Sequence, residues 1–356
     1  MGDDRNSAAW QDLSALPVVV ESYEFERRVS TGYGYERVTT VIHLRGAGAE
    51  GLGEDISPHE TEDDTLHVLA PELPLTGEWT LGALCERLRE LDQWPVAPRW
   101  EPARRWRNWA FESAAVDLAL NQAGRPLHEV VGRAPRPVRF VNSLGLGDPP
   151  TFDPIRRRLE LHPNVRFKLD VTAAWTSELM DEVAATGAVE IVDFKGHYGL
   201  ELPELPELLR MYERVLETFP VALIEDAHDL PEVTQLLAAA ADRISYDAPI
   251  TTVESLDAIP LAPVAVNIKP CRVGDLRSLL DLYATCDARG LTMYGGGMGE
   301  LGIGRAQIQL LASLFHPDGP NDVAPSDYNR DTPTADLPPS PLPAEPAATG
   351  FRLSDQ

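Results

Sequence analysis

"VALIEDAHDLPEVTQLLAAAADRISYD" (residues 221–247) decides the fold of this chain. Two short apolar runs, VALIED (221–226) and RISYD (243–247), enclose LPEVTQLLAAAA, whose apolar residues recur at helical spacing. A strand, a helix and a second strand in this order form a crossover unit, which places the two strands parallel in one sheet. The stretch therefore predicts a parallel sheet covered by helices.

The same unit repeats from about residue 138 to the far end of the chain. Five further apolar runs alternate with helical stretches: RFVNSL (139–144), VRFKLD (165–170), VEIVDF (189–194), VAVNIK (264–269) and LTMYGG (291–296). With these, seven strands are predicted, and NDVAP (321–325) is a candidate for an eighth. This number favours a (β/α)₈ barrel over an open doubly wound sheet, in which fewer strands are usual.

The chain before about residue 130 has a different organisation. VVVESYEFERRV (18–29) and RVTTVIHLRG (37–46) are typical of antiparallel strands on either side of an exposed loop, STGYGYE (30–36). Helical patterns follow at 81–91 and 109–124. We therefore expect three parts: an α+β domain over 1–130, the barrel over 131–328, and a Pro-rich C-terminal tail over 329–356 that is extended or disordered.

The composition of the chain argues against several kinds of binding partner and metal site. A formal charge of -25 argues against nucleic acid or an anionic membrane as a partner, because both require a cationic face. Three scattered cysteines are too few for a disulfide framework or a Cys-rich zinc site. The first residues, MGDDRNSAAWQDLSAL, lack the pattern of a secretory signal. We expect a cytoplasmic protein that acts on a small molecule.

Charged residues stand where the barrel strands are predicted to end. Three consecutive strands end in Asp193, Glu225 and Asp247, and the carboxyl ends of barrel strands open on one face, where catalytic groups lie. One such carboxylate would more often be a helix cap or a loop residue, but three of them close together would repel one another without a cation. Oxygen ligands of this kind favour Mg²⁺ over zinc. The flanking strands carry Lys168 and Lys269.

Three stretches of the sequence resemble one known family. VNIKPCRVGDLRSLLDLYATCDARGLTMYGGGMGELGIG (266–304) is similar to a region of the enolase superfamily, in its muconate lactonizing enzyme and mandelate racemase-like branch, where a strand-ending lysine precedes a helix and a Gly-Gly-x-Met-x-Glu turn. FESAAVDLALNQAGRPLHEVVG (111–132) and GLGEDISP (51–58) resemble its junction helix and a turn of its capping domain. The resemblance covers roughly 18–325. It implies a modified (β/α)₈ barrel with an N-terminal α+β capping domain, and a homo-oligomer.

The resemblance also implies roles for individual residues. Asp193, Glu225 and Asp247 match the three Mg²⁺ ligands at the ends of the third, fourth and fifth barrel strands. Lys269 matches the acid/base lysine of the sixth strand, Lys168 matches a second-strand lysine that holds the substrate carboxylate, and Glu300 matches a carboxylate near the substrate. The implied chemistry is removal of a proton α to a carboxylate, giving an enediolate held by Mg²⁺.

Two positions depart from the family pattern. Asp170 stands where a second catalytic lysine is usual, which argues against two-lysine racemisation. Lys195, in VDFKGHYG (192–199), stands where an Asp-x-Asn motif is common. Lys195 either pairs with Asp170, supplies a cation that the second strand has lost, or is an exposed loop residue.

These features give one functional hypothesis and two alternatives. The hypothesis is a lyase (dehydratase) or a cycloisomerase, in which Lys269 removes the α-proton and Asp170, Lys168 or a water helps the leaving group to depart. The alternatives are a catalytically altered metal-binding relative that serves as a binding protein, and an epimerase or racemase that uses Lys195 as its second base. We expect the loop around Tyr33 to contact the carboxylate substrate.

Overall fold

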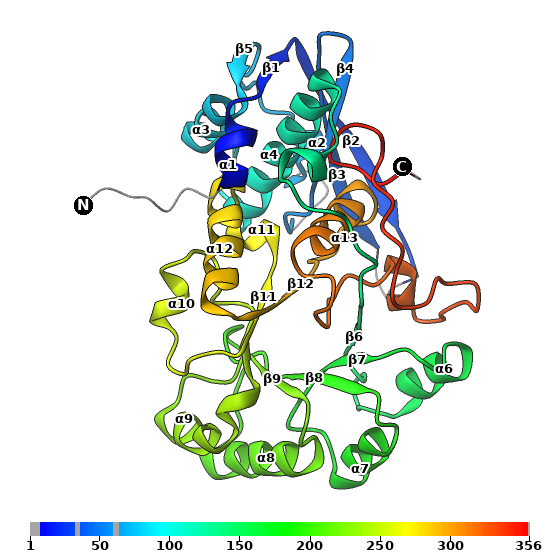
Figure 1. Cartoon of the computed structure of the whole chain (residues 1–356). Coiled ribbons are helices and arrows are strands. Elements are labelled where there is room, and N and C mark those ends of the chain that lie inside the picture. The colour runs from blue at the N-terminus through cyan, green and yellow to red at the C-terminus, as the bar shows by residue number, and fades with distance from the viewer. Residues whose placement is uncertain (1–7, 33–35, 60–63, 355–356) are drawn as a thin grey trace.

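The computed structural model describes residues 8–32, 36–59 and 64–354. In Figure 1 the N-terminal strands β1 to β5 lie at the top, and helices α6 to α9 of the barrel lie at the bottom. Tyr33, which the sequence places near the substrate, lies outside the described residues. Within those ranges no helix combines the length and the apolar character that crossing a membrane requires.

The N-terminal part is an α+β cap, as predicted. Its strands form a three-stranded antiparallel sheet and a two-stranded pair: β2 (Ser22–Ser30), β3 (Arg37–Gly46) and β4 (Ala49–Asp55), and β1 (Pro17–Val20) with β5 (Gly77–Thr80). Its helices are α1 (Ala8–Ser14), α2 (Leu66–Leu69), α3 (Leu81–Glu90) and α4 (Ala103–Ala123). Glycine is needed where α4 crosses β4, since a Cβ on Gly53 would lie 2.0 Å from the carbonyl oxygen of Ala110.

The second part is the predicted barrel. Seven parallel strands pair in chain order: β6 (Asn142–Leu144), β7 (Phe167–Asp170), β8 (Val189–Asp193), β9 (Leu223–Glu225), β10 (Ile244–Tyr246), β11 (Ala265–Ile268) and β12 (Thr292–Gly295). The predicted eighth strand is reduced to two parallel bridges, from Asn321 to Phe140 and from Asp322 to Gly296. These bridges join the two edges of the sheet, so the fold is a capped (β/α)₈ barrel.

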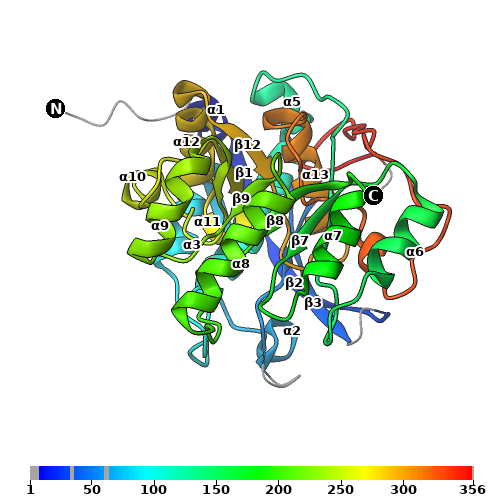
Figure 2. The same ribbon diagram turned by 90° about the horizontal axis from the view of Figure 1, so that it is seen from below.

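The remaining helices lie before, between and after the barrel strands along the chain. They are α5 (Leu127–Val130), α6 (Asp153–Leu161), α7 (Ser177–Ala185), α8 (Leu205–Thr218), α9 (Pro231–Leu237), α10 (Ser255–Ala258), α11 (Pro270–Val273), α12 (Leu276–Arg289) and α13 (Ile303–Phe315), with 3₁₀ turns η2 (Ala238–Arg243) and η3 (Ser326–Asn329). Figure 2, seen from below, shows α7, α8 and α9 on the outer side of the strands.

Side-chain alternation along the strands separates the apolar core from the charged interior. In β7, Phe167 and Leu169 join the large apolar core, whereas Lys168 and Asp170 occupy the alternate positions. Successive strand residues point to opposite faces of a sheet, so Lys168 and Asp170 face the barrel interior together. This alternation explains why a buried strand carries two charged residues.

The Pro-rich tail packs against both parts of the molecule. The backbone of Leu342 bridges to Val138, and the carbonyl oxygen of Gly350 accepts a hydrogen bond from Leu127 N. The tail ends on the buried carboxylate of Asp117 in α4, which accepts hydrogen bonds from Phe351 N and Arg352 Nε, each at 2.7 Å. The described tail is therefore ordered by contacts with both the barrel and the cap.

The Asp117→Ala variant tests this attachment. Removing the carboxylate leaves buried N–H donors without partners, so we expect a loss of unfolding free energy on the order of 3 kcal/mol, measured by urea denaturation. The matched control is Asp153→Ala, because Asp153 forms exposed ion pairs on α6 and should cost less than about 1 kcal/mol. Equal midpoints for the two variants would contradict the structural role of Asp117.

A second buried carboxylate, that of Glu112, joins the cap to the barrel. It accepts hydrogen bonds from Leu276 N at 2.7 Å, at the start of α12, and from Asn108 Nδ2 at 3.0 Å. Burial, and to a smaller extent the charge of Asp275, raises the pKa of Glu112 from 4.5 to about 8. The folded protein therefore keeps a proton on Glu112 that the unfolded chain releases above about pH 4.5.

This shift gives a pH prediction with a definite sign. Because the folded state binds the extra proton, the stabilisation from Glu112 is complete below about pH 4.5 and is lost as the pH rises towards about 8. We expect Glu112→Gln to lose less thermal stability than the wild type between pH 5 and pH 8, measured by calorimetry. Glu86→Gln, on the exposed side of α3, is the control and should lose as much thermal stability over this pH range as the wild type. An equal loss in Glu112→Gln and the wild type would contradict the role given to Glu112.

Candidate active site

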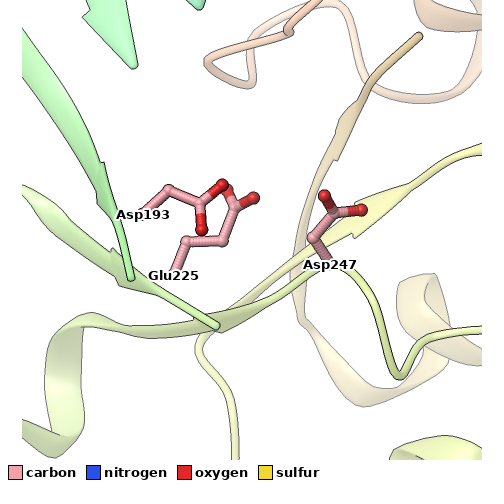
Figure 3. A group of neighbouring side chains, drawn as sticks. All are labelled: Asp193, Glu225 and Asp247. Atoms are coloured by element: carbon pink, nitrogen blue, oxygen red, sulfur yellow. The ribbon is translucent and has the colours of Figure 1, made fainter. Parts of the chain in front are cut away.

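Three carboxylates from consecutive strands meet at the carboxyl end of the barrel. Asp193 ends β8, Glu225 ends β9, and Asp247 directly follows β10. Each contributes an oxygen within 4.8 Å of the others, and all three side chains are fully buried. Figure 3 shows them directed into one space. Three carboxylate oxygens in this arrangement fit a hard divalent cation, so the donor set matches the predicted metal site.

Lys168 places a positive charge among these carboxylates. Its Nζ forms an ion pair with Glu225 Oε1 and lies 3.1 Å from Asp193 Oδ2 and 3.9 Å from Asp247 Oδ2. Burial opposes the charge, but the carboxylates outweigh it and raise the pKa of Lys168 well above its ordinary value. Lys168 thus stays an ammonium ion. It lies one inward-facing position before the level of Asp193 and Glu225, because Asp170 is the β7 residue that pairs in register with Asp193.

Lys269 and Arg272 approach Asp247 from the other side. Lys269 Nζ donates to Asp247 Oδ2 at 2.8 Å, and Arg272 Nη1 lies 3.2 Å from Oδ1 of the same carboxylate. Burial would raise the pKa of Asp247, but Arg272, Lys269 and Lys168 hold it far below its usual range. The sequence prediction omitted Arg272. Its position on the short helix α11, three residues after the strand-ending Lys269, is the signal that could have indicated it.

Lys195 contacts two carboxylates. Its Nζ lies 3.2 Å from Asp170 Oδ1 and 2.5 Å from Asp193 Oδ2, and its side chain is 21% exposed. Lys195 thus forms the predicted pair with Asp170 and also brings a cation to Asp193, and it is not a freely solvated loop residue. Its backbone is in the left-handed region, with φ at 52°, and its N–H donates to Asp193 Oδ1. Lys168 and Lys195 outweigh the effect of burial and lower the pKa of Asp193 to about 2.

Glu300 is held by its own turn. Its Oε2 accepts hydrogen bonds from Met298 N at 2.9 Å and from Gly299 N at 3.2 Å, and it lies 3.8 Å from Arg305 Nη2. The cap secures the same turn, because Glu54 of β4 accepts from the backbone N–H groups at the start of α13. Met298, in this turn, places its sulfur 3.6 Å from Lys269 Nζ. The turn therefore positions a thioether beside the amine of Lys269.

The barrel interior holds further polar groups that the sequence prediction omitted. Tyr294 of β12 donates to Glu225 Oε2, and Ser245 of β10 contacts the same phenol oxygen. Asp322, at the eighth strand position, is partly buried, and this burial raises its pKa. Strand alternation could have indicated Ser245, which lies two residues before Asp247. The phenol of Tyr294 contacts a residue 69 positions away, so no local pattern could predict its partner.

The chain is similar to known proteins in sequence and in fold. Residues 134–330 match a family model described as "Domain of unknown function (DUF8230) C-terminal domain", and residues 11–130 match the N-terminal domain model of the same family. An N-succinylamino acid racemase of Thermus thermophilus is 28% identical over 319 residues, which cover 83% of this chain and 81% of that protein. An o-succinylbenzoate synthase of Bacillus subtilis is 33% identical, over 64% of this chain and 62% of that protein.

Solved structures share the fold. A dipeptide epimerase of Methylococcus capsulatus, complexed with Mg and the dipeptide L-Arg-D-Lys, has a TM-score of 0.67 and 22% identity, and covers 89% of this chain and 93% of its own. A muconate cycloisomerase of Pseudomonas fluorescens has a TM-score of 0.63 and 21% identity, over 86% of this chain and 87% of its own. At these identities the likeness shows the capped barrel fold.

The metal-binding capacity of the three carboxylates can be tested directly. We expect Asp193→Asn to weaken Mn²⁺ binding by at least about 100-fold, measured by isothermal titration, because it removes one of three charged ligands. Asp229→Asn is the matched control, since Asp229 is exposed and lies in the neighbouring loop. Equal Mn²⁺ affinity in Asp193→Asn and the wild type would place the metal elsewhere.

Proposed function

Because the chain belongs to the DUF8230 family and to the enolase superfamily, in its muconate lactonizing enzyme and mandelate racemase-like branch, we propose that it is an Mg²⁺-dependent enzyme that removes a proton α to a carboxylate. The observation that carries this proposal is the position of Lys269, whose Nζ lies 2.8 Å from Asp247 Oδ2. A base and a cluster of metal-ligand candidates therefore face one another inside a buried site.

Each side chain of the site has its own role in this reaction. Lys269 accepts the α-proton, and the thioether of Met298 and the surrounding strands limit the access of water to its Nζ. Asp193, Glu225 and Asp247 would hold Mg²⁺, which supplies positive charge to offset the negative charge that develops on the substrate carboxylate. Lys168 and Arg272 add fixed positive charge on either side of Asp247. The resulting enediolate is stabilised by charges that are in place before the reaction.

We favour a lyase or a cycloisomerase for the second half of the reaction. On β7 the residue two positions after Lys168 is Asp170, and its carboxylate is engaged by Lys195. A carboxylate at this position does not supply the second lysine that a two-lysine racemase requires. One proton is then removed by Lys269, and Asp170, Lys168 or a water assists departure of the leaving group or closure of a ring.

Lys195 is the observation that favours a second candidate, an epimerase. Lys195 follows β8, and Lys269 follows β11, three strands away. The two amines therefore enter the site from different sides of the barrel. The relatives named as a racemase and a dipeptide epimerase support this candidate as well. In it, Lys195 would return a proton to the face opposite Lys269.

Proton exchange in D₂O tests the proposal. The protein is incubated with Mg²⁺ and a panel of N-succinylamino acids and dipeptides. We expect at least one compound to gain deuterium at its α-carbon, measured by NMR. We expect Lys269→Ala to lower the exchange rate by about 10²–10⁴-fold, because it removes the general base. Arg277→Ala, in an exposed pair on α12, is the control and should exchange at the wild-type rate.

The outcomes separate the candidates. Full exchange in Lys269→Ala would overturn the assignment of the base. Wild-type protein that places α-deuterium in both stereoisomers of a compound would identify the epimerase, if Lys195→Ala labels only one of the two stereoisomers. Tight binding of a panel compound without any exchange in the wild type would identify a binding protein that has lost catalysis.

A further inference from the structure

Tyr294 reaches from one wall of the barrel towards the carboxylates on another. It is the third residue of β12 and pairs in register with Asn267 of β11. Its ring packs with Val141, Ile191 and Ala265 in the interior apolar cluster, and its exposed fraction is 0%. The side chain therefore crosses the inside of the barrel, below the space into which Glu225 and its neighbours open.

The phenol hydroxyl makes two hydrogen bonds at this depth. It donates to Glu225 Oε2 at 2.5 Å and lies 2.5 Å from Ser245 Oγ. A phenol has one hydrogen to donate. Since that hydrogen goes to the carboxylate, the hydroxyl of Ser245 donates to the phenol oxygen. Ser245, Tyr294 and Glu225 thus form a directed chain of hydrogen bonds that ends on a metal-ligand candidate.

This chain fixes the orientation of the Glu225 carboxylate. Oε1 pairs with Lys168, and Oε2 receives the hydrogen bond from Tyr294. A buried phenol without a hydrogen-bond partner would be costly, so the Tyr294 hydroxyl and Glu225 Oε2 hold one another in place. A glutamate side chain has several rotatable bonds, so a fixed partner below the site limits the directions in which its oxygens can point.

We propose that Tyr294, assisted by Ser245, is a positioning residue that orients Glu225 for binding a divalent cation. This inference rests on the metal site of the proposed function. Outer partners of metal-binding carboxylates commonly change metal affinity by about 10–100-fold when they are removed. Tyr294 makes no contact with the reacting atoms and acts through Glu225.

The test uses Mn²⁺ alone as the probe, with isothermal titration of the full chain. Tyr294→Phe keeps the packed ring and removes the hydroxyl, and we expect its Mn²⁺ Kd to rise about 10–100-fold. Ser245→Ala should raise the Kd by a smaller factor. The double variant should match Tyr294→Phe, because Ser245 acts only through the phenol.

Tyr283→Phe is the matched control. Tyr283, on α12, is also fully buried, but it stacks on Phe315 at the end of α13 and lies outside the site. We expect its Kd to equal that of the wild type. Thermal unfolding without metal shows whether each variant is folded, and a purely structural role for Tyr294 would lower its Tm without changing the Kd.

The outcomes distinguish this inference from the proposed function. If the wild type binds Mn²⁺, Asp193→Asn does not, and folded Tyr294→Phe binds within 2-fold of the wild type, the metal site stands and the positioning role is overturned. If the wild type does not bind Mn²⁺, both are overturned. Additive losses in the double variant would overturn the hydrogen-bond chain through Tyr294.

Discussion

Repulsion among three buried carboxylates is the constraint on which the rest of the site depends. Asp193, Glu225 and Asp247 are withdrawn from water within 4.8 Å of one another, and uncompensated charges of this kind are strongly disfavoured inside a protein. The barrel compensates with positive charge from several elements: Lys168 from β7, Lys195 after β8, and Arg272 on α11. The same charges serve chemistry that develops negative charge on a carboxylate.

The cap and the tail are held to the barrel by the same kind of contact. Three buried carboxylates of the cap each receive backbone N–H groups from elsewhere in the chain: Glu54 binds the start of α13, Glu112 binds the start of α12, and Asp117 binds the C-terminal tail. Hydrogen bonds are stronger in the low-dielectric interior of a protein than in water. The turn that carries Met298 and Glu300 is therefore positioned by the cap as well as by the barrel.

The sequence predicted features that depend on local periodicity, and it missed those that depend on distant contacts. Alternation within single strands and the repeated βα unit indicated the barrel and the convergence of the three carboxylates, which the structure confirms. The pairing of Lys195 with Asp170 was one of three readings, because it depends on a left-handed turn after β8. No local pattern in the sequence predicts the contact of Tyr294 with Glu225 or the contact of Asp117 with the tail. Both contacts join residues that only the folded chain brings together.

The most direct test of the central claim is a crystal structure of the full chain soaked with Mn²⁺, using anomalous scattering to locate the ion. We expect one strong peak within about 2.0–2.3 Å of a carboxylate oxygen from each of Asp193, Glu225 and Asp247, distances typical of hard divalent cations bound by oxygen. Lys269 should face this peak. An anomalous map without a peak at the three carboxylates, with Lys168 still paired to Glu225, would contradict the claim that these residues form a metal centre.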